Sequence, residues 1–202
     1  MPDTIAGLQL VAGEPALDFT NTVSWRGAER WEDWLEDFGD LLWWGVRAGL
    51  LDAGSVRARL KRVTGEEEEI FRRAIALREA IFDVYGSLAR KTPPSDAALA
   101  RLSEEWSRAQ SRRRLVAGEE GFGSRIVAEE ASELLISSLA ANAGDLLLSL
   151  EPARVKACAG RECGFLYADT SRNRSRRWCD MADCGNRAKV RRFRARSRAD
   201  TG

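Results

Sequence analysis

Four cysteines near the end of the chain have the residue type and the spacing of a metal site. Cys158 and Cys163 form one C-x4-C pair, and Cys179 and Cys184 form a second such pair, with fifteen residues between the pairs. Two close pairs at this separation can place four sulfur atoms around one tetrahedral Zn²⁺ ion. Four sulfur ligands leave no coordination position for water, so the spacing predicts a single structural zinc. Two disulfides, four unrelated buried thiols and a redox role are the alternatives.

Basic residues cluster in the same part of the chain. Residues 151–202 carry 14 Lys and Arg against 6 Asp and Glu, a net charge of +8, whereas residues 1–150 have a net charge of −7. Arg outnumbers Lys in this tail by twelve to two. Guanidinium groups make bidentate contacts with phosphates and guanines, so the tail is predicted to bind nucleic acid. A solvated basic helix and a docking site for an acidic protein are the alternatives.

The candidate nucleic-acid contacts fall into two groups, one between the cysteine pairs and one after them. They are Arg172, Asn173, Arg174, Arg176 and Arg177 in the first group, and Asn186, Arg187, Lys189, Arg191, Arg192, Arg194 and Arg196 in the second.

The sequence around the cysteines predicts how they are brought together. Two short strand-like runs, Ala153–Cys158 and Phe165–Asp169, enclose the first pair and predict a hairpin. The residues after Cys184 have helical composition, which puts this cysteine at a helix start, in a treble-clef-like arrangement. On that helix Arg187, Arg191, Arg194 and Arg198 share one face, while Val190 and Phe193 can turn inward.

The preceding residues predict an α+β fold that is mainly helical with short β-hairpins. The 202 residues are enough for one medium domain, 1–150, and a small zinc finger, 151–202. Alternation around the turn Gly13–Pro15 predicts two short strands or one hairpin, with Leu8, Leu10, Leu17 and Phe19 as candidate inward positions. Helical periodicity is expected over 28–48, 54–63, from Thr64 to the prolines at 93–94, after Ser95, and over 129–150, with a hairpin at 112–128.

Two features of these segments carry specific expectations. Thr64 and Glu67 have the spacing of a capping box, and the acidic run Glu66–Glu69 complements the helix dipole. Five of the seven tryptophans lie between Trp25 and Trp44. That cluster could line a pocket, although packing in the core is the simpler interpretation.

Residues 1–150 contain no recognisable catalytic motif, and we expect that the protein is not an enzyme. The chain contains no histidine, which removes the commonest general base, and no nucleophile-elbow, P-loop or dinucleotide motif. Asp18 and Asn21 are polar residues in an apolar run and, with Trp25, could face a pocket. They could equally satisfy backbone groups at the end of a strand.

Compartment signals are consistent with the metal interpretation. The N-terminus lacks the basic and apolar regions of a signal peptide, and the apolar runs are too short to span a bilayer. We therefore expect a cytoplasmic protein, in a reducing compartment where clustered cysteines bind metal more often than they form disulfides.

The tail also resembles a known family at its most specific motifs. Cys184–Arg187 reads CGNR and is preceded by DTSRNRSRRWC at Asp169–Cys179, as in the CGNR-type zinc finger of bacterial proteins, a match covering about Val155 to Arg196. Such fingers commonly follow an ABATE domain of stress-induced transcription regulators, and ALDFTNTVSWRG at Ala16–Gly27 is similar to its opening motif. The resemblance implies a zinc-binding, DNA-binding C-terminus and a regulatory or ligand-sensing N-terminal domain.

These observations together predict a zinc-dependent protein that binds duplex DNA as a bacterial transcription regulator, whose N-terminal domain senses a small ligand or a protein. An RNA-binding protein and a zinc-stabilised interaction adaptor are the alternatives. A homodimer is plausible because a single finger with one helix has a small footprint on DNA.

Overall fold

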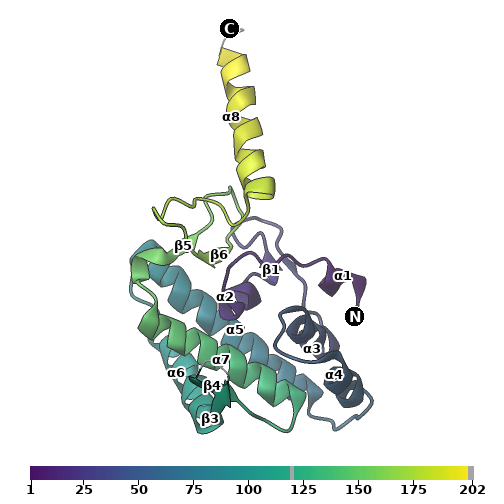
Figure 1. The fold of residues 1–202 in the computed structure, drawn as a ribbon. Helices are drawn as coiled ribbons and strands as arrows, with labels where there is room; N and C mark the ends of the chain where they lie inside the picture. The colour runs from purple at the N-terminus through teal and green to yellow at the C-terminus, as the bar shows by residue number, and fades with distance from the viewer. Residues whose placement is uncertain (119–120, 200–202) are drawn as a thin grey trace.

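The computed structural model describes residues 1–118 and 121–199, with side chains through residue 197. Figure 1 shows a helical body, short strands of the tail above it, and a last helix that points away. The body helices are α1 (Asp3–Ala6), α2 (Pro15–Thr20), α3 (Phe38–Arg47), α4 (Ala53–Leu60), α5 (Glu67–Arg90), α6 (Asp96–Ser111) and α7 (Ala131–Ser149).

The described strands form three separate antiparallel pairs. They are β1 (Val23–Ser24) with β2 (Glu32–Asp33), β3 (Arg113–Gly118) with β4 (Gly121–Ile126), and β5 (Val155–Ala157) with β6 (Leu166–Ala168). The tail adds the short helices η1 (Pro152–Arg154) and η2 (Met181–Gly185), followed by α8 (Asn186–Ala199). This confirms the predicted fold class, a mainly helical body with short hairpins and a small zinc finger.

The three longest body helices form its centre because each carries an apolar face. Ile81 and Tyr85 of α5 and Leu135 of α7 are fully buried, and α6 packs against both of these helices. Gly144 of α7 faces Trp106 of α6, and a Cβ atom on this glycine would lie only 2.1 Å from the indole ring. Close approach of α6 and α7 therefore requires glycine here. No helix of the described chain is both long and apolar enough to cross a membrane.

The two strands or hairpin predicted around residue 13 are wrong, because the chain forms α2 there. Pro15 occupies the first turn, where its missing N–H is not needed. The residues from Ala16 to Thr20 are all buried, since α2 packs against α5, α7 and β6. A short helix covered on every side presents a continuous apolar run, and periodicity cannot tell such a run from a strand. Leu17 and Phe19 do face the core as expected.

The helix predicted from residue 28 begins only at Phe38. Asp37 caps it, because its carboxylate accepts a hydrogen bond from the Asp40 N–H. The preceding residues instead form a loop that contains β2. Buried Arg78 of α5 anchors this loop by donating to both carboxylate oxygens of Asp33, at 2.7 and 2.6 Å. A tertiary ion pair therefore overrides the local helical pattern.

The remaining helix starts agree more closely with the sequence. Glu67 opens α5, and its carboxylate accepts from the N–H groups of Thr64 and Gly65. The hydrogen bond from the Thr64 N–H is the main cause that lowers the pKa of Glu67 to about 2. This is one half of the predicted capping box, since the Thr64 side chain does not cap in return and Glu66 takes the N-cap position. Ser95 caps α6 through the Ala98 N–H, as predicted.

The tail packs directly onto the body. β5 lies against α5, and β6 lies against α2. Asn21, just after α2, donates to the Leu166 carbonyl at 2.8 Å and accepts from the Leu166 N–H at 2.9 Å. The Ala168 N–H donates to the Ala12 carbonyl at 2.9 Å. The segment around α2 therefore covers the free edge of β6 and links body to finger.

We expect Asn21→Ala to destabilise this link, because the buried backbone groups of Leu166 would lose both partners. An unsatisfied buried group costs about 1–3 kcal/mol, so the free energy of unfolding should fall by roughly 2–5 kcal/mol. Urea denaturation of the zinc-loaded protein measures this change. Asn173→Ala, in the exposed loop of the finger, is the matched control and should stay within about 0.5 kcal/mol of wild type. Equal stability of both variants would contradict the assignment.

Candidate metal centre and basic helix

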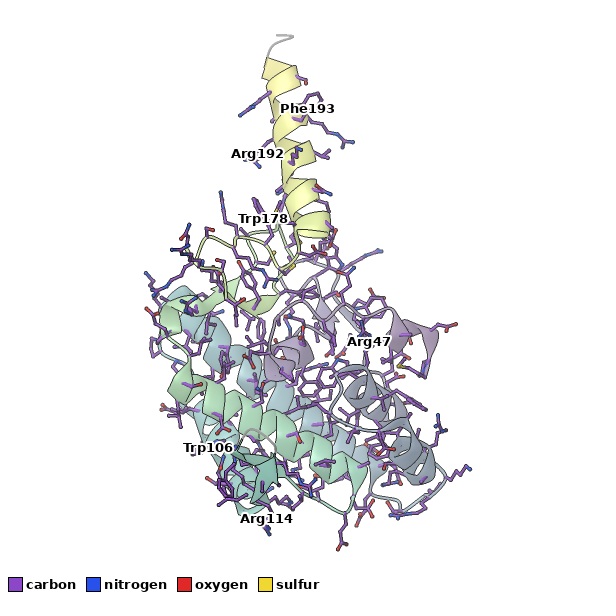
Figure 2. The ribbon with its side chains drawn as sticks, viewed as in Figure 1. Arg47, Trp106, Arg114, Trp178, Arg192 and Phe193 are labelled. Carbon is purple, nitrogen blue, oxygen red and sulfur yellow. The ribbon has the colours of Figure 1, made fainter. Side chains whose placement is uncertain are left out.

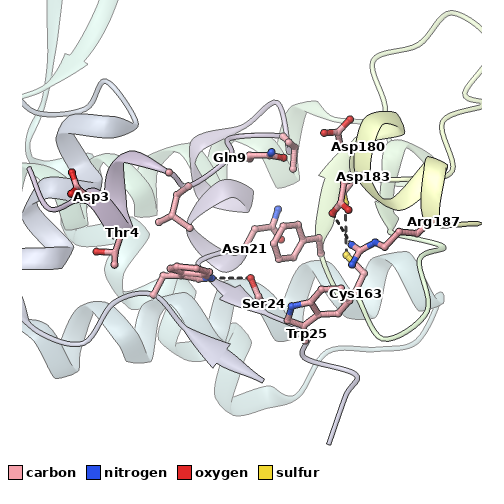
Figure 3. Close-up of a pocket in the computed structure, with 16 residues that line it drawn as sticks. Asp3, Thr4, Gln9, Asn21, Ser24, Trp25, Cys163, Asp180, Asp183 and Arg187 are labelled. Atoms are coloured by element: carbon pink, nitrogen blue, oxygen red, sulfur yellow. Dashed lines mark hydrogen bonds and ion pairs between the residues drawn. The ribbon is translucent and has the colours of Figure 1, made fainter. Parts of the chain in front are cut away.

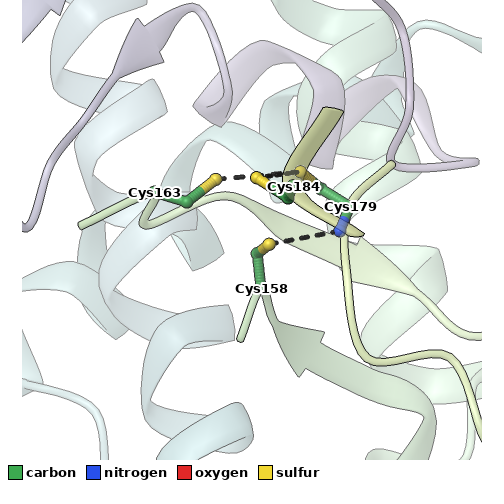
Figure 4. Close-up of side chains that lie close together, drawn as sticks. All are labelled: Cys158, Cys163, Cys179 and Cys184. Carbon is green, nitrogen blue, oxygen red and sulfur yellow. Dashed lines mark hydrogen bonds between the residues drawn. The ribbon is translucent and has the colours of Figure 1, made fainter. Parts of the chain in front are cut away.

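The four cysteines meet at one point, as the spacing predicts (Figure 4). Their sulfur atoms all lie within 4.8 Å of one another, and Cys163 to Cys179 and Cys179 to Cys184 are each 3.7 Å apart. Tetrahedral zinc with Zn–S bonds near 2.3 Å requires sulfurs about 3.8 Å apart. All four cysteines are free, which rules out the two-disulfide alternative in this structure. The arrangement fits one Zn²⁺.

The backbone around the sulfur atoms supplies N–H donors to a thiolate and leaves space for the cluster. The N–H groups of Gly160 and Cys179 donate to the Cys158 sulfur at 3.3 and 3.2 Å. Such donors stabilise a thiolate and orient it toward the metal. A Cβ atom at position 160 would lie 2.8 Å from the Cys184 sulfur and 3.3 Å from that of Cys158. Only glycine therefore leaves room for the cluster.

The thiols perturb one another strongly. Hydrogen bonds from the Cys163 and Cys179 thiols lower the pKa of Cys158 to about 2. The hydrogen bond with Cys158 in turn raises the pKa of Cys163 to about 12, and the pKa of Cys179 is raised as well. Four thiolates this close form together only when a divalent cation offsets their charge, so metal binding releases protons.

The hairpin and the helix start position the ligands as expected. Residues 158–165 connect β5 to β6 and contain both Cys158 and Cys163, and Gly164 in this connection adopts a positive φ of 73°. Cys184 lies in η2, immediately before α8. Asp180 caps η2 by accepting from the Ala182 N–H at 2.8 Å.

A buried carboxylate that the sequence analysis missed organises the loop between the ligand pairs. Asp169 is fully buried and accepts hydrogen bonds from Lys156, Ser171 and the Arg176 N–H. Burial alone would raise its pKa, but the Lys156 and Ser171 hydrogen bonds outweigh it and lower the pKa well below the usual range. Its position at the start of DTSRNRSRRWC was the one available signal.

Arg176 has a different role from the one that the sequence suggests. Its guanidinium donates to the carbonyls of Val11, Trp178 and Cys179 and stacks over the Tyr167 ring, 4.2 Å from the ring centre. These contacts join the finger to the N-terminal segment. The side chain is therefore a structural clamp and not a free contact for a partner.

The other loop residues predicted to bind nucleic acid are exposed. Arg172, Asn173 and Arg177 reach solvent, and the Arg177 guanidinium lies 5.3 Å from the centre of the Trp178 ring. Arg174 is exposed too, although it pairs with Glu151 at 2.6 Å. The loop thus presents cationic groups on the outer side of the finger.

Helix α8 leaves the finger and extends away from the body (Figure 2). Asn186, Lys189, Arg191, Arg192, Arg194 and Arg196 are all exposed, and the Arg198 side chain lies outside the described residues. The inward orientation predicted for Val190 and Phe193 is wrong, because they are 47% and 71% exposed. Past its first turn the helix has no body surface to pack against, so its apolar side chains stay in solvent.

Arg187, at the base of α8, connects this helix to the metal site and to the body. Its guanidinium pairs with Asp183 at 2.6 Å, lies 3.4 Å from the Cys184 sulfur and stacks over the Trp25 ring at 4.4 Å. A single side chain of α8 thus contacts both a metal ligand and the N-terminal segment.

Of the three residues predicted to face a pocket, Asn21 and Trp25 line the same cavity and Asp18 does not. Asn21 and Trp25 border a cavity beside the finger, but Asn21 also serves the backbone of β6, as the structural interpretation predicted. Asp18 lies outside that cavity lining and instead accepts from the Ala12 N–H at 2.9 Å. Burial raises the pKa of Asp18 to about 6.

We expect zinc removal to unfold the finger while the body stays folded. The tail is too small to build a sufficient core without its metal, whereas the helices of the body supply most of the buried apolar residues of the shared core. Metal analysis should find one Zn²⁺ per chain and little in Cys163→Ser. Replacing zinc with Co²⁺ should give the absorption of a tetrahedral thiolate site. A different stoichiometry, or an octahedral cobalt spectrum, would overturn the assignment.

Asp18 should make stability depend on pH. Its pKa is about 6 when folded against 3.8 for the ordinary carboxyl, so the folded state binds the extra proton between these values. Stability contributed by this group is therefore lost as pH rises from about 4 to above 6. The stability of wild type minus that of Asp18→Asn should fall by on the order of 2–3 kcal/mol over this range. Urea midpoints at several pH values measure it, and a constant difference would contradict the prediction.

Two family models match the chain. One, ABATE, carries the description "Putative stress-induced transcription regulator" and matches residues 13–149. The other, the CGNR zinc finger, matches residues 154–197 and contains all four sulfur ligands. A comparison with curated proteins gave no match. The resemblance noted at the CGNR and ALDFTNTV motifs is thereby confirmed. The chain belongs to the ABATE family and ends in a CGNR zinc finger that binds one Zn²⁺ through Cys158, Cys163, Cys179 and Cys184.

Proposed function

We propose that the protein binds duplex DNA and regulates transcription. The DNA would contact α8 and the exposed loop between the two cysteine pairs, residues 172–177. The observation that carries this proposal is the unpaired charge of α8. Among the described side chains, none of the five basic residues of α8 that follow Arg187 has an acidic partner. These residues are Lys189, Arg191, Arg192, Arg194 and Arg196.

The dimensions of α8 support a duplex partner. Its 14 residues span about 21 Å at 1.5 Å per residue, and a helix with its side chains is about 10–12 Å wide. The major groove of B-form DNA is about 12 Å wide and accepts such a helix. The major groove of an RNA duplex is deep and narrow, which makes a helix a poor reader of it.

Charge repulsion along α8 also supports a polyanionic partner such as DNA. A helix of this length is marginal in water on its own, and here like charges repel along most of its surface. Phosphates would relieve that repulsion through several Arg contacts at once. Exposed Phe193 could add an apolar contact with a thymine methyl group.

The body then supplies regulation rather than chemistry. We infer a cytoplasmic, non-enzymatic protein, in line with the absence of histidine and of catalytic motifs from the sequence. A homodimer would double the small footprint of one helix and read two half-sites. A protein adaptor remains the second candidate, since the same exposed cations could dock on an acidic protein.

We expect DNA binding to depend steeply on salt and on α8. Each phosphate contact contributes about −0.9 to the slope of log K against log salt, so Arg191→Ala with Arg194→Ala should reduce the slope by roughly 2. Affinity should fall at least tenfold, without loss of zinc. Fluorescence anisotropy with a labelled duplex measures both quantities. The matched control replaces exposed body residues Arg30 and Arg57 with Ala and should leave binding unchanged.

Selection of binding sites from a random duplex pool decides between the candidates. Enrichment of one motif by zinc-loaded protein supports a sequence-reading regulator. Tighter binding to structured RNA in direct competition, or a salt-independent interaction, would contradict the proposal and favour the RNA-binding or adaptor function.

A further inference from the structure

A cavity of about 380 Å³ lies between the N-terminal segment and the zinc finger (Figure 3). Asp3 and Thr4 of α1 border one end, and Asp183 of η2 and its N-cap residue Asp180 border the other. Cavities of this size are typical of small-molecule sites, which are mainly apolar with a few placed polar groups. The cavity is therefore large enough for a ligand but too small for a folded partner.

Aromatic side chains form its apolar walls. Trp25 and Trp34 come from the body and Phe165 from the finger. The Trp34 N–H is already bonded to the Ser24 hydroxyl at 2.9 Å, so this side chain offers the cavity its ring and not a donor. Flat aromatic walls favour a flat or cationic guest.

The charges around the cavity are mainly negative. Three carboxylates border it, on Asp3, Asp180 and Asp183, against one guanidinium, on Arg187. Arg187 is already paired with Asp183 at 2.6 Å and stacked on Trp25. An anionic guest would thus meet uncompensated carboxylates, whereas an ammonium group would meet Asp180 or Asp3 together with aromatic faces.

Trp25 has an unusual backbone conformation at this place. Its φ is 61°, in the left-handed region that bulky residues rarely adopt. Such strain costs on the order of 1–3 kcal/mol and clusters at ligand-binding sites, where the surrounding structure maintains it. Here it directs the indole between the cavity and Arg187, and the Ala28 N–H bonds to the Trp25 carbonyl at 2.8 Å.

The cavity also contacts the parts of the finger that matter for its function. Cys163 and Cys179, two of the zinc ligands, border it, as does Arg187 at the base of α8. A guest would therefore touch the body, the metal site and the basic helix at once. Its binding energy would depend on how these parts are arranged.

We propose that this cavity binds an aromatic organic cation and that the bound ligand changes the affinity of α8 for nucleic acid. The first half rests on the cavity alone, and the second half rests on the proposed function. Coupling acts through Arg187, because a guest beside Asp183 and Trp25 competes with both of its contacts. Linkage then requires that nucleic acid change the affinity for the ligand by the same factor.

Calorimetry with three probes of similar shape tests the binding half. Tryptamine carries an ammonium group, tryptophol a hydroxyl and indole-3-acetate a carboxylate. Zinc-loaded full-length protein should bind tryptamine at least tenfold more tightly than tryptophol, and indole-3-acetate most weakly. No binding of tryptamine at millimolar concentration, or a preference for the carboxylate, would overturn the proposal.

Two variants locate the site. Asp180→Asn keeps an oxygen to cap η2 but removes the charge, so tryptamine affinity should fall about tenfold and tryptophol affinity should not change. Trp25→Asn, which tolerates a positive φ, should weaken both probes. Asp37→Asn, at the cap of α3 and outside the cavity lining, is the matched control. Zinc content is measured for each protein, and an unchanged preference for tryptamine in zinc-loaded Asp180→Asn would refute the assignment.

Duplex titrations with and without saturating tryptamine test the coupling half. The expected result is at least a threefold change in Kd, with the reciprocal change in tryptamine affinity. Duplex binding that ignores bound tryptamine would refute the coupling. Failure of any duplex to bind would refute the proposed function instead, and the calorimetric result would still decide whether the cavity is a ligand site.

Discussion

The close packing of four thiolates is the constraint on which the functional end of this protein depends. Sulfur atoms within 4.8 Å of one another cannot all be ionised unless a divalent cation lies among them. Once bound, the ion ties the β5–β6 hairpin to the base of α8. We therefore expect the fold of the finger to depend on metal binding, and Cys184 in η2 places one ligand directly before α8.

The finger is nevertheless not an independent appendage. Asn21 pairs with the backbone of β6, Arg176 reaches the Val11 carbonyl, and Arg187 stacks on Trp25. The segment around α2 is thus common to both parts, and one hydrophobic core runs from Leu135 of the body to Tyr167 of the finger. A change in the N-terminal segment has a direct physical route to the metal site, as regulation of a finger by its neighbour requires.

The body and helix α8 also differ in how their charged side chains are paired. Many cations of the body pair with acids of the same body, as where Arg73 joins Glu105 and Glu133 of two neighbouring helices. Beyond Arg187, the described cations of α8 instead have no acidic partner, and the helix points away from the body. This separation limits self-association between tail and body and leaves the cations available to a polyanion.

Much of this protein was predictable from its sequence. Cysteine spacing alone specified the ligands, because zinc accepts only a narrow set of donors and distances. Capping at Ser95 and the apolar faces of α5 and α7 specified the long helices, because helix formation there is a local matter. Tertiary structure decided what local pattern could not. Tertiary packing buries residues 15–20 as helix α2. The Arg78–Asp33 ion pair holds the preceding loop, so that α3 begins only at Phe38. Arg176 donates to the Val11 carbonyl and so joins the finger to the N-terminal segment. In each case the deciding partner lies far away in the sequence, so only the folded chain brings the contact into being.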